Sequence, residues 1–251
     1  MTTHASTMHP RVRWTRWTSR TSALALGLLA ALALTAPAAQ GQARGQGSAV
    51  LSDTEAASRV DRSSWEPRQR NWRENRRTPT PSELQQFFDR NHNWGRCGER
   101  LKRNVTGRFT GTTDEIIQWA AHKWGIDRDI IRAVTVKESY WNQDAAADWD
   151  RYGTPQSFGL TQIRRQANPG TYPLSKESTA FALDYYGASL RFYYDGCADW
   201  LRGLDGNWSY GGGDIWGAVG AWYSGRWYNG GARWYIGEIK NVLSSRTWER
   251  F

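Results

Sequence analysis

Glu138 is the carboxylate whose position along the chain is most informative. It lies four residues after Val134 and seven after Ile131, so in a helix that begins after Asp127 it shares the apolar face. Lost hydration on that face and the negative end of the helix dipole both favour the protonated carboxyl. We expect the pKa of Glu138 to rise from about 4.3 by about one to two units, making it a proton donor near neutral pH.

The alternatives to this reading involve the last turn of the helix and three neighbouring acids. Glu138 could instead point outward from a frayed helix end. Asp144, Asp148 and Asp150 follow in a segment predicted to be a loop, and any of them could act as a second carboxylate. Because loop acids are more often solvated or capping residues, each is a weaker candidate than Glu138.

Residues 206–235 combine nine glycines with nine tryptophans or tyrosines. Flat aromatic rings cover the apolar faces of sugars, and glycine lets the backbone approach a ligand closely. Such a composition is typical of a carbohydrate cleft. Most of the rings are nevertheless expected to pack in the core, with a minority contacting a ligand.

Two helices are predicted to position Glu138. Apolar residues recur every four positions between an N-cap at Thr112 or Thr113 and a stop at Gly125. A second helix is expected to begin at Asp127 and to end soon after Glu138. The acid would therefore lie at the carboxyl end of an amphipathic helix.

Three more helices are predicted in the second half of the chain. The first is capped by Ser175 and runs to Tyr194 with Asp184 facing outward, the next begins at Asp214, and the last spans about 232–243. No window shows sustained alternation of apolar and polar residues. The fold class is therefore expected to be mainly α.

The first 43 residues have the layout of an export signal. Residues 11–20 contain four arginines and no acid, and Ala23–Leu34 is an apolar run of twelve residues. At about 1.5 Å per residue, this run is too short to cross a hydrocarbon core of about 30 Å. Cleavage is expected after Ala38 or Ala43, and the absence of cysteine here argues against a lipid anchor. The sequence predicts a secreted protein without a stable membrane anchor.

Net charge gives little support to nucleic-acid binding. The chain carries 33 Lys plus Arg against 24 Asp plus Glu, a formal charge of +9, and four of the arginines belong to the predicted signal. Without them the charge is about +5, and residues 82–251 are near +2 by the same counting. A nucleic-acid-binding domain would be expected to show a more basic face, so no nucleic acid is predicted as a partner.

Residues 44–81 are predicted to be a disordered linker before a domain at 82–251. The segment holds eight Arg and five acids among Ser, Gln and Pro, without an apolar period. Its arginines could contact an anionic surface such as a cell wall, or the segment could be only a solvated tether.

The chain contains two cysteines, Cys97 and Cys197. In an exported protein, pairing is the default, so a disulfide is expected rather than two buried thiols. Four histidines and two cysteines are too few for a zinc array. We expect no metal and no cofactor.

Three motifs in order resemble those of the soluble lytic transglycosylases, a goose-type-lysozyme-like group of the lysozyme superfamily. Glu138-Ser139 is similar to the Glu-Ser pair at a helix end, Ser157–Ile163 to the Gly-Leu-Met-Gln loop, and Ala221–Gly225 to the Ala-Tyr-Asn-x-Gly turn. The likeness covers roughly residues 113–243. Thr161 stands where Met is usual, and either Trp222 or Tyr223 would fill the Tyr position.

The resemblance implies a lysozyme-like helical domain and a set of site residues. Glu138 would be catalytic. The residues expected to bind or orient the substrate are Ser139, Ser157, Gly159, Leu160, Gln162, Trp222 and Tyr223.

The implied reaction is cleavage of the β-1,4 bond between N-acetylmuramic acid and N-acetylglucosamine in peptidoglycan. Glu138 would protonate the leaving oxygen, the substrate's acetamido group would assist, and Glu138 would then take the proton of the muramyl C6 hydroxyl. A 1,6-anhydro sugar would result. This path needs one carboxylate, whereas a retaining hydrolase needs a partner about 5 to 5.5 Å away.

The sequence therefore predicts an exported, monomeric peptidoglycan lytic transglycosylase. A hydrolytic lysozyme of the same fold is the nearest alternative, with water activated by one of the loop acids. A non-catalytic module that binds the cell wall is another. An exported nucleic-acid binder would show steep salt dependence, which a nearly neutral domain should not.

Overall fold

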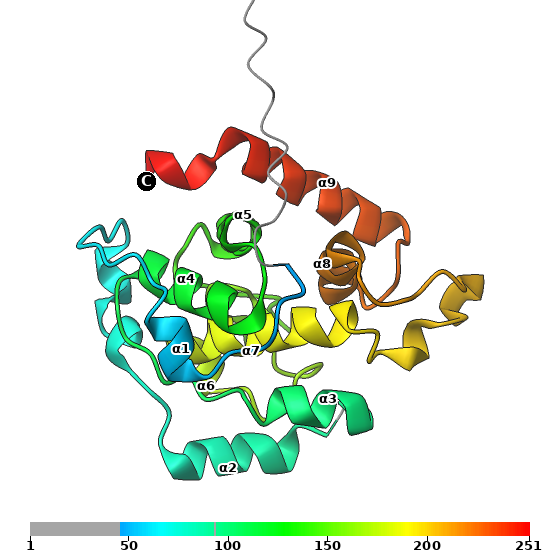
Figure 1. Ribbon diagram of the computed structural model, residues 1–251, viewed down its shortest axis with the longest axis horizontal. Helices are drawn as coiled ribbons and strands as arrows, with labels where there is room; N and C mark the ends of the chain where they lie inside the picture. Colours follow the sequence, from blue (N-terminus) through cyan, green and yellow to red (C-terminus); the bar gives the residue numbers. More distant parts are fainter. Residues whose placement is uncertain (1–45, 93) are drawn as a thin grey trace, which may run out of the picture. The chain divides into compact units, whose positions relative to one another are not determined.

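The computed structural model describes residues 46–92 and 94–251 (Figure 1). The predicted signal peptide, residues 1–43, lies outside this range, as do its cleavage sites at Ala38 and Ala43. The described part is mainly helical, as the sequence predicts. Its α-helices are α1 (Asp53–Ala57), α2 (Pro81–Arg90), α3 (Gly95–Lys102), α4 (Thr113–Trp124), α5 (Arg128–Ser139), α6 (Leu174–Glu177), α7 (Thr179–Tyr194), α8 (Ile215–Ser224) and α9 (Gly230–Ser245).

Short elements complete the described fold. The 3-10 helices are η1 (Gln69–Trp72), η2 (Glu74–Arg76), η3 (Asp199–Leu201), η4 (Leu204–Gly206) and η5 (Thr247–Arg250). Three two-residue strands, β1 (Ala146–Ala147), β2 (Ser157–Phe158) and β3 (Ile163–Arg164), form one antiparallel sheet in the order β1-β2-β3. The loop that follows α5 is thus folded back on itself beside the helices.

Local capping explains where α4 and α5 begin and end. Thr112, one of the two predicted caps, accepts a hydrogen bond from the Glu115 amide and forms a capping box with it. Gly125 ends α4 with φ of 60°, a conformation that favours glycine. Asp127 caps α5 by accepting a bond from the Asp129 amide. The predicted boundaries of both helices are confirmed.

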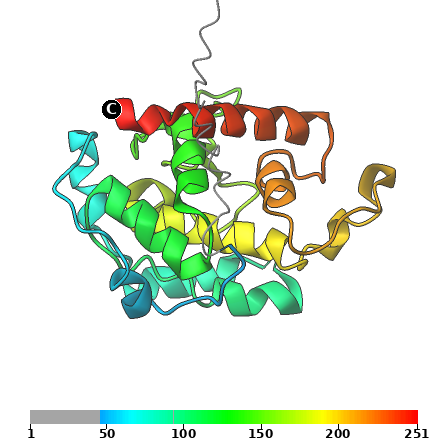
Figure 2. The ribbon, with the colours of Figure 1, turned by 45° about the horizontal axis from the view of Figure 1, so that its top comes forward.

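Helix α7 lies at the centre of the helical assembly. It packs against α3, α4, α6 and α8, and Figures 1 and 2 show it (yellow) running between α4 and α8. Most of its residues are buried, which is typical of a helix covered on all sides.

The prediction for the start of α7 is wrong. Ser175 belongs to the separate short helix α6, and Ser178 caps α7 by accepting a bond from the Phe181 amide. The predicted outward position of Asp184 is also wrong. Asp184 is fully buried, with its carboxylate accepting bonds from Lys123 Nζ at 2.7 Å and Trp124 Nε1 at 2.7 Å. A buried carboxylate is tolerated here because a cation and several donors surround it.

Helices α8 and α9 cover the other side of α7 and α5. Asp214 caps α8, as predicted, and accepts a bond from the Gly217 amide at 3.0 Å. The last predicted helix, 232–243, is confirmed but is longer at both ends, since Asn229 caps α9. Helix α9 packs across α5 and α8 (Figure 1).

The predicted disordered linker at 44–81 is wrong for the part that the structure describes, residues 46–81. Helix α1 packs on α4, and Ala56 and Val60 are buried there. The Asp53 carboxylate accepts a bond from the buried Lys123 ammonium at 2.6 Å, and Glu66 accepts one from the Thr113 amide at 2.7 Å. The segment lacks an apolar period because polar partners on the helical core hold it instead. The folded unit therefore begins well before residue 82.

The predicted disulfide is confirmed. Cys97 in α3 is bonded to Cys197, which follows α7, and their Cα atoms lie 5.4 Å apart. The bond closes a loop of about 100 residues, for which the chain-entropy estimate is on the order of 4 kcal/mol of stabilisation. None of the helices in the described ranges is long and apolar enough to cross a membrane.

Candidate active site

A cavity of about 860 Å³ opens between the end of α5, the small sheet, α7 and α8. Five of the predicted site residues line it: Glu138, Ser157, Gln162, Trp222 and Tyr223. These residues are separated by as many as 85 positions in the sequence, so the fold brings them together. Aromatic rings and many polar side chains line it, and a cavity of this size can hold a small molecule or part of a polymer.

Glu138 lies one residue before the end of α5, and its side chain reaches the cavity. The chain leaves the helix through Tyr140, which adopts a left-handed conformation with φ of 55°. The Tyr235 hydroxyl, from the middle of α9, donates a hydrogen bond to Glu138 Oε1. Glu138 therefore does not point outward from a frayed turn; α9 fixes its orientation.

Tyr235 is itself held in place by stacking. It is buried, and its ring lies parallel to that of Tyr223 with the centroids 4.4 Å apart. Tyr223 is 48% exposed and forms part of the cavity wall. The stack therefore joins the wall of the cavity to the hydroxyl that orients Glu138.

The environment of Glu138 favours its protonated form. Burial raises the pKa of Glu138 from its usual value of 4.5 to about 7. The Tyr235 hydrogen bond and the Lys137 charge act in the opposite direction, while the Asp148 charge adds to the increase. The direction is the one that the sequence predicts, and a substantial fraction of Glu138 carries a proton near neutral pH.

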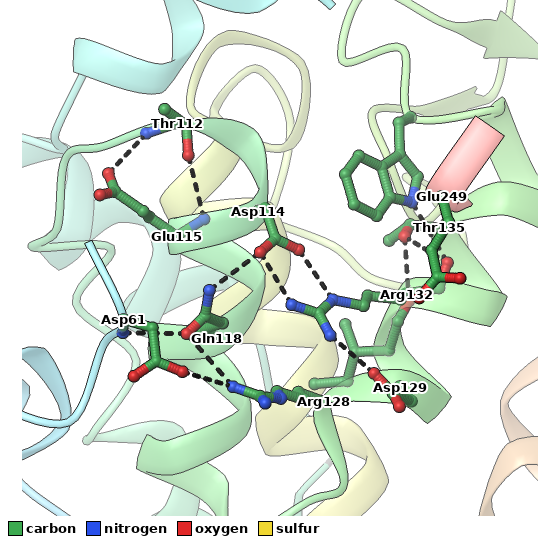
Figure 3. A network of polar contacts seen from close by, with 12 residues as sticks. Asp61, Thr112, Asp114, Glu115, Gln118, Arg128, Asp129, Arg132, Thr135 and Glu249 are labelled. Atoms are coloured by element: carbon green, nitrogen blue, oxygen red, sulfur yellow. Dashed lines mark hydrogen bonds and ion pairs between the residues drawn. The ribbon is translucent and has the colours of Figure 1, made fainter. Parts of the chain in front are cut away.

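The position of α5 is set by a polar network with α4 (Figure 3). Arg132 makes a bidentate contact with Asp114, through Nε at 2.7 Å and Nη2 at 2.8 Å. It also donates to Asp129 at 2.7 Å, and Gln118 donates to the same Asp114 at 2.9 Å. Bidentate charge-assisted bonds are geometrically restrictive, so this network restricts movement of α5 along α4.

The loops beneath the site meet at Gln143, a fully buried residue. Its side-chain amide donates to the Ser175 carbonyl at 2.9 Å and accepts from the Leu160 amide at 3.1 Å. Its own backbone amide donates to Asn71 Oδ1 at 2.9 Å. Asn71 in turn donates to the Trp141 carbonyl at 2.8 Å, so residues of η1 support the backbone that follows Glu138.

Three predicted substrate-binding residues do not line the cavity and instead support it. Ser139 donates to the Leu160 carbonyl at 3.0 Å, tying α5 to the loop, and Leu160 is fully buried. Gly159 has φ of 79°, and a Cβ there would lie 2.3 Å from the Ser175 carbonyl oxygen. Glycine is therefore required at this position by the close approach of the Ser175 backbone.

Gln162 and Ser157 line the cavity, and the side chains of both are bonded within the fold. Gln162 Nε2 donates to the Gly159 carbonyl at 2.9 Å, while its buried Oε1 has no hydrogen-bond partner among the described residues. That oxygen is buried, so other atoms of Gln162 form its part of the cavity wall. The Ser157 hydroxyl is already used, since it donates to Asp148 Oδ2.

The three loop acids have different environments. Asp148 lines the cavity with Glu138. Asp144 is exposed and pairs with Arg70 at 3.4 Å, and Asp150 accepts bonds from the amides of its own loop. Of these three acids, only Asp148 lines the cavity, so it is the one candidate for a second carboxylate in a hydrolytic reaction.

Trp222 and Tyr223 both line the cavity, and they contact different partners. The Trp222 ring packs edge-on against the buried Tyr186 at 5.0 Å, whereas Tyr223 stacks on Tyr235. Within the described ranges, the hydroxyl bonded to Glu138 belongs to neither of them but to Tyr235.

Tyr235, Gln143 and Asn71 are the supporting residues that sequence reasoning missed. Tyr235 ends the glycine- and aromatic-rich stretch 206–235, so the composition indicated its region without singling out its ring. No local signal marks Gln143 or Asn71, because their partners are distant in the chain. In the described ranges, no group of three or more His, Cys, Asp or Glu side chains is arranged to hold a metal ion.

Comparisons of the chain with family models, with curated proteins and with solved structures found no match.

Proposed function

We propose that this protein is an exported, monomeric lytic transglycosylase with a lysozyme-like domain, which cleaves the β-1,4 MurNAc–GlcNAc bond of peptidoglycan. The observation that carries the proposal is Glu138: a carboxyl on a cavity wall, with a pKa of about 7. The three motifs that resemble the family's support it, because they lie at the end of α5, in the β2–β3 loop and at the end of α8, around this cavity.

In the proposed mechanism, protonated Glu138 gives its proton to the leaving glycosidic oxygen. Tyr235 donates to Oε1, which leaves Oε2 to carry the transferred proton. As the bond to the leaving oxygen breaks, the substrate's acetamido oxygen bonds to the anomeric carbon. The resulting Glu138 carboxylate then removes the proton from the C6 hydroxyl, whose oxygen displaces the acetamido group to form the 1,6-anhydro ring.

The other cavity residues have binding roles in this proposal. Gln162, whose side-chain amide donates to the Gly159 carbonyl, would shape the part of the wall that the sugar meets. The half-exposed Tyr223 ring and Trp222 would cover apolar sugar faces. The mechanism needs no metal or cofactor, since one carboxyl serves as acid and then as base.

Product analysis tests the proposal. Purified peptidoglycan is digested with the protein and the fragments are analysed by mass spectrometry, with Glu138→Gln as the inactive variant and Asp144→Asn as a matched acid substitution outside the cavity. We expect 1,6-anhydro-muropeptides from the wild type and Asp144→Asn, and none from Glu138→Gln. Reducing-end muramic acid alone would contradict a transglycosylase.

A hydrolytic lysozyme is the second candidate, and the position of Asp148 on the cavity wall favours it. In that reaction, Asp148 would activate a water molecule in place of the C6 hydroxyl. Reducing-end products that disappear in Asp148→Asn would establish it. Binding of cell-wall glycan without turnover by any variant would instead indicate a non-catalytic module.

A further inference from the structure

The cavity extends along α7 well beyond Glu138. Tyr185, Ser189 and Tyr193 of α7 line it at spacings of four residues. At about 1.5 Å per residue, the eight positions from Tyr185 to Tyr193 span about 12 Å of helix. Glu138 is bonded to Tyr235, whose ring stacks on Tyr223, and the neighbouring Trp222 packs on Tyr186 of α7. Glu138 therefore belongs to the end of the cavity at Tyr185. The other end is not used by the mechanism above.

Trp200 of η3 lines the cavity at this second end. Figure 1 shows the segment that contains η3 (gold) beyond the carboxyl end of α7. The Trp200 side chain is 50% exposed, whereas Trp94, which also lines the cavity, is 5% exposed. Trp200 therefore presents ring surface to the cavity that the packing of the described residues does not cover.

The backbone on both sides of Trp200 is firmly held. Ala198 and Leu201 are fully buried, and the Ala198 amide donates to the Tyr210 hydroxyl at 2.9 Å. Cys197, three residues before Trp200, is bonded to Cys97 of α3. A half-exposed ring on a backbone fixed in this way loses little conformational freedom when a ligand covers it.

We propose that Trp200 is a stacking platform for a sugar unit distant from the cleaved bond, so that the protein binds long β-1,4 glycan strands in preference to short ones. The inference rests on the proposed function, since it assigns a substrate preference to the same cavity. An indole face covers the apolar face of a sugar ring, and its N–H supplies a hydrogen-bond donor at the edge. The Cys97–Cys197 bond holds this platform against α3.

Binding of N-acetylglucosamine oligomers to the full chain tests the inference. The Glu138→Gln variant is used as the background so that the oligomers stay intact, and affinities for chitobiose and chitohexaose are measured by calorimetry. Trp200→Ala is compared with Trp208→Ala, a matched control in the same segment whose ring is 74% exposed and does not line the cavity. Trp200→Phe tests whether any aromatic ring suffices.

We expect Trp200→Ala to weaken chitohexaose binding about tenfold, because one sugar ring would lose the indole that covers its apolar face. Chitobiose affinity should not change, Trp208→Ala should bind both oligomers as the background does, and Trp200→Phe should keep most of the affinity. Equal losses for both oligomers, equal losses in Trp208→Ala, or no loss in Trp200→Ala would each overturn the role of Trp200 alone. Absence of glycan binding in every variant would overturn the proposed function, and this inference with it.

Discussion

The raised pKa of Glu138 makes a prediction about stability that does not depend on any substrate. In the unfolded chain the carboxyl titrates near 4.5, and in the folded protein near 7. Between these pH values the folded state binds more protons than the unfolded state, so the free energy of unfolding falls as pH rises through this window. The difference of about 2.5 pKa units corresponds to about 3 kcal/mol, at about 1.4 kcal/mol per unit.

Glu138→Gln removes this titration while keeping an oxygen that can accept the Tyr235 hydrogen bond. Near pH 4 the variant and the wild type should be about equally stable, because both side chains are neutral. Near pH 8 the variant should be more stable by about 3 kcal/mol, since the wild type then carries a poorly solvated charge. Titration of every other group is common to both proteins and cancels in the comparison.

Urea unfolding followed by tryptophan fluorescence measures these differences. Glu138→Ala provides a control. Its free energy of unfolding should change with pH as that of Glu138→Gln does, but it should be lower at every pH because the smaller side chain leaves a cavity. Equal m-values for all three proteins would establish that the unfolding transitions are comparable. A stability difference between Glu138→Gln and the wild type that is the same at both pH values would refute the argument.

Three further predictions concern the groups around Glu138 and the loop beneath it. Tyr235→Phe removes a hydrogen bond that lowers the pKa of Glu138, so the midpoint of its titration should move above 7, and an unchanged or lower midpoint would contradict this. Asp148→Asn removes a charge that raises the same pKa, so the midpoint should move down in NMR titrations, and an upward move would exclude the assigned charge effect. Gly159→Ala should lower the free energy of unfolding in urea by at least about 1 kcal/mol more than Gly153→Ala does. Both positions have positive φ, but only the Cβ at Gly159 would meet backbone, at 2.3 Å from the Ser175 carbonyl oxygen. Equal losses would show that a small backbone shift relieves this contact.

Local signals in the sequence were sufficient to predict much of the fold that carries the site. The caps Thr112, Asp127 and Asp214 act within one helical turn, so residue types and spacing indicate them directly. The position of Glu138 on the apolar face of α5 follows from the same short-range periodicity. The disulfide could be predicted because only one pairing of the two cysteines is possible within a chain.

Features that depend on distant partners could not be predicted in this way. Tyr235 lies 97 residues from Glu138, and only the packing of α9 on α5 brings its hydroxyl to the carboxylate. The burial of Asp184 depends on Lys123, 61 residues earlier, which supplies the compensating charge. The burial of Asn71 could not be predicted either, because nothing in the arginine-rich sequence around it indicates that its side-chain amide is buried and bonded to the Trp141 carbonyl.

The proposed catalysis depends most directly on the protonation state of Glu138. A ¹³C NMR titration of the labelled glutamate carboxyl groups, with the Glu138 signal assigned by its loss in Glu138→Gln, measures that state in the folded protein. We expect a midpoint of about 7 for this signal. A midpoint near the usual 4.5 would contradict the role of Glu138 as the acid, because Glu138 would then be ionised and unable to donate a proton near neutral pH.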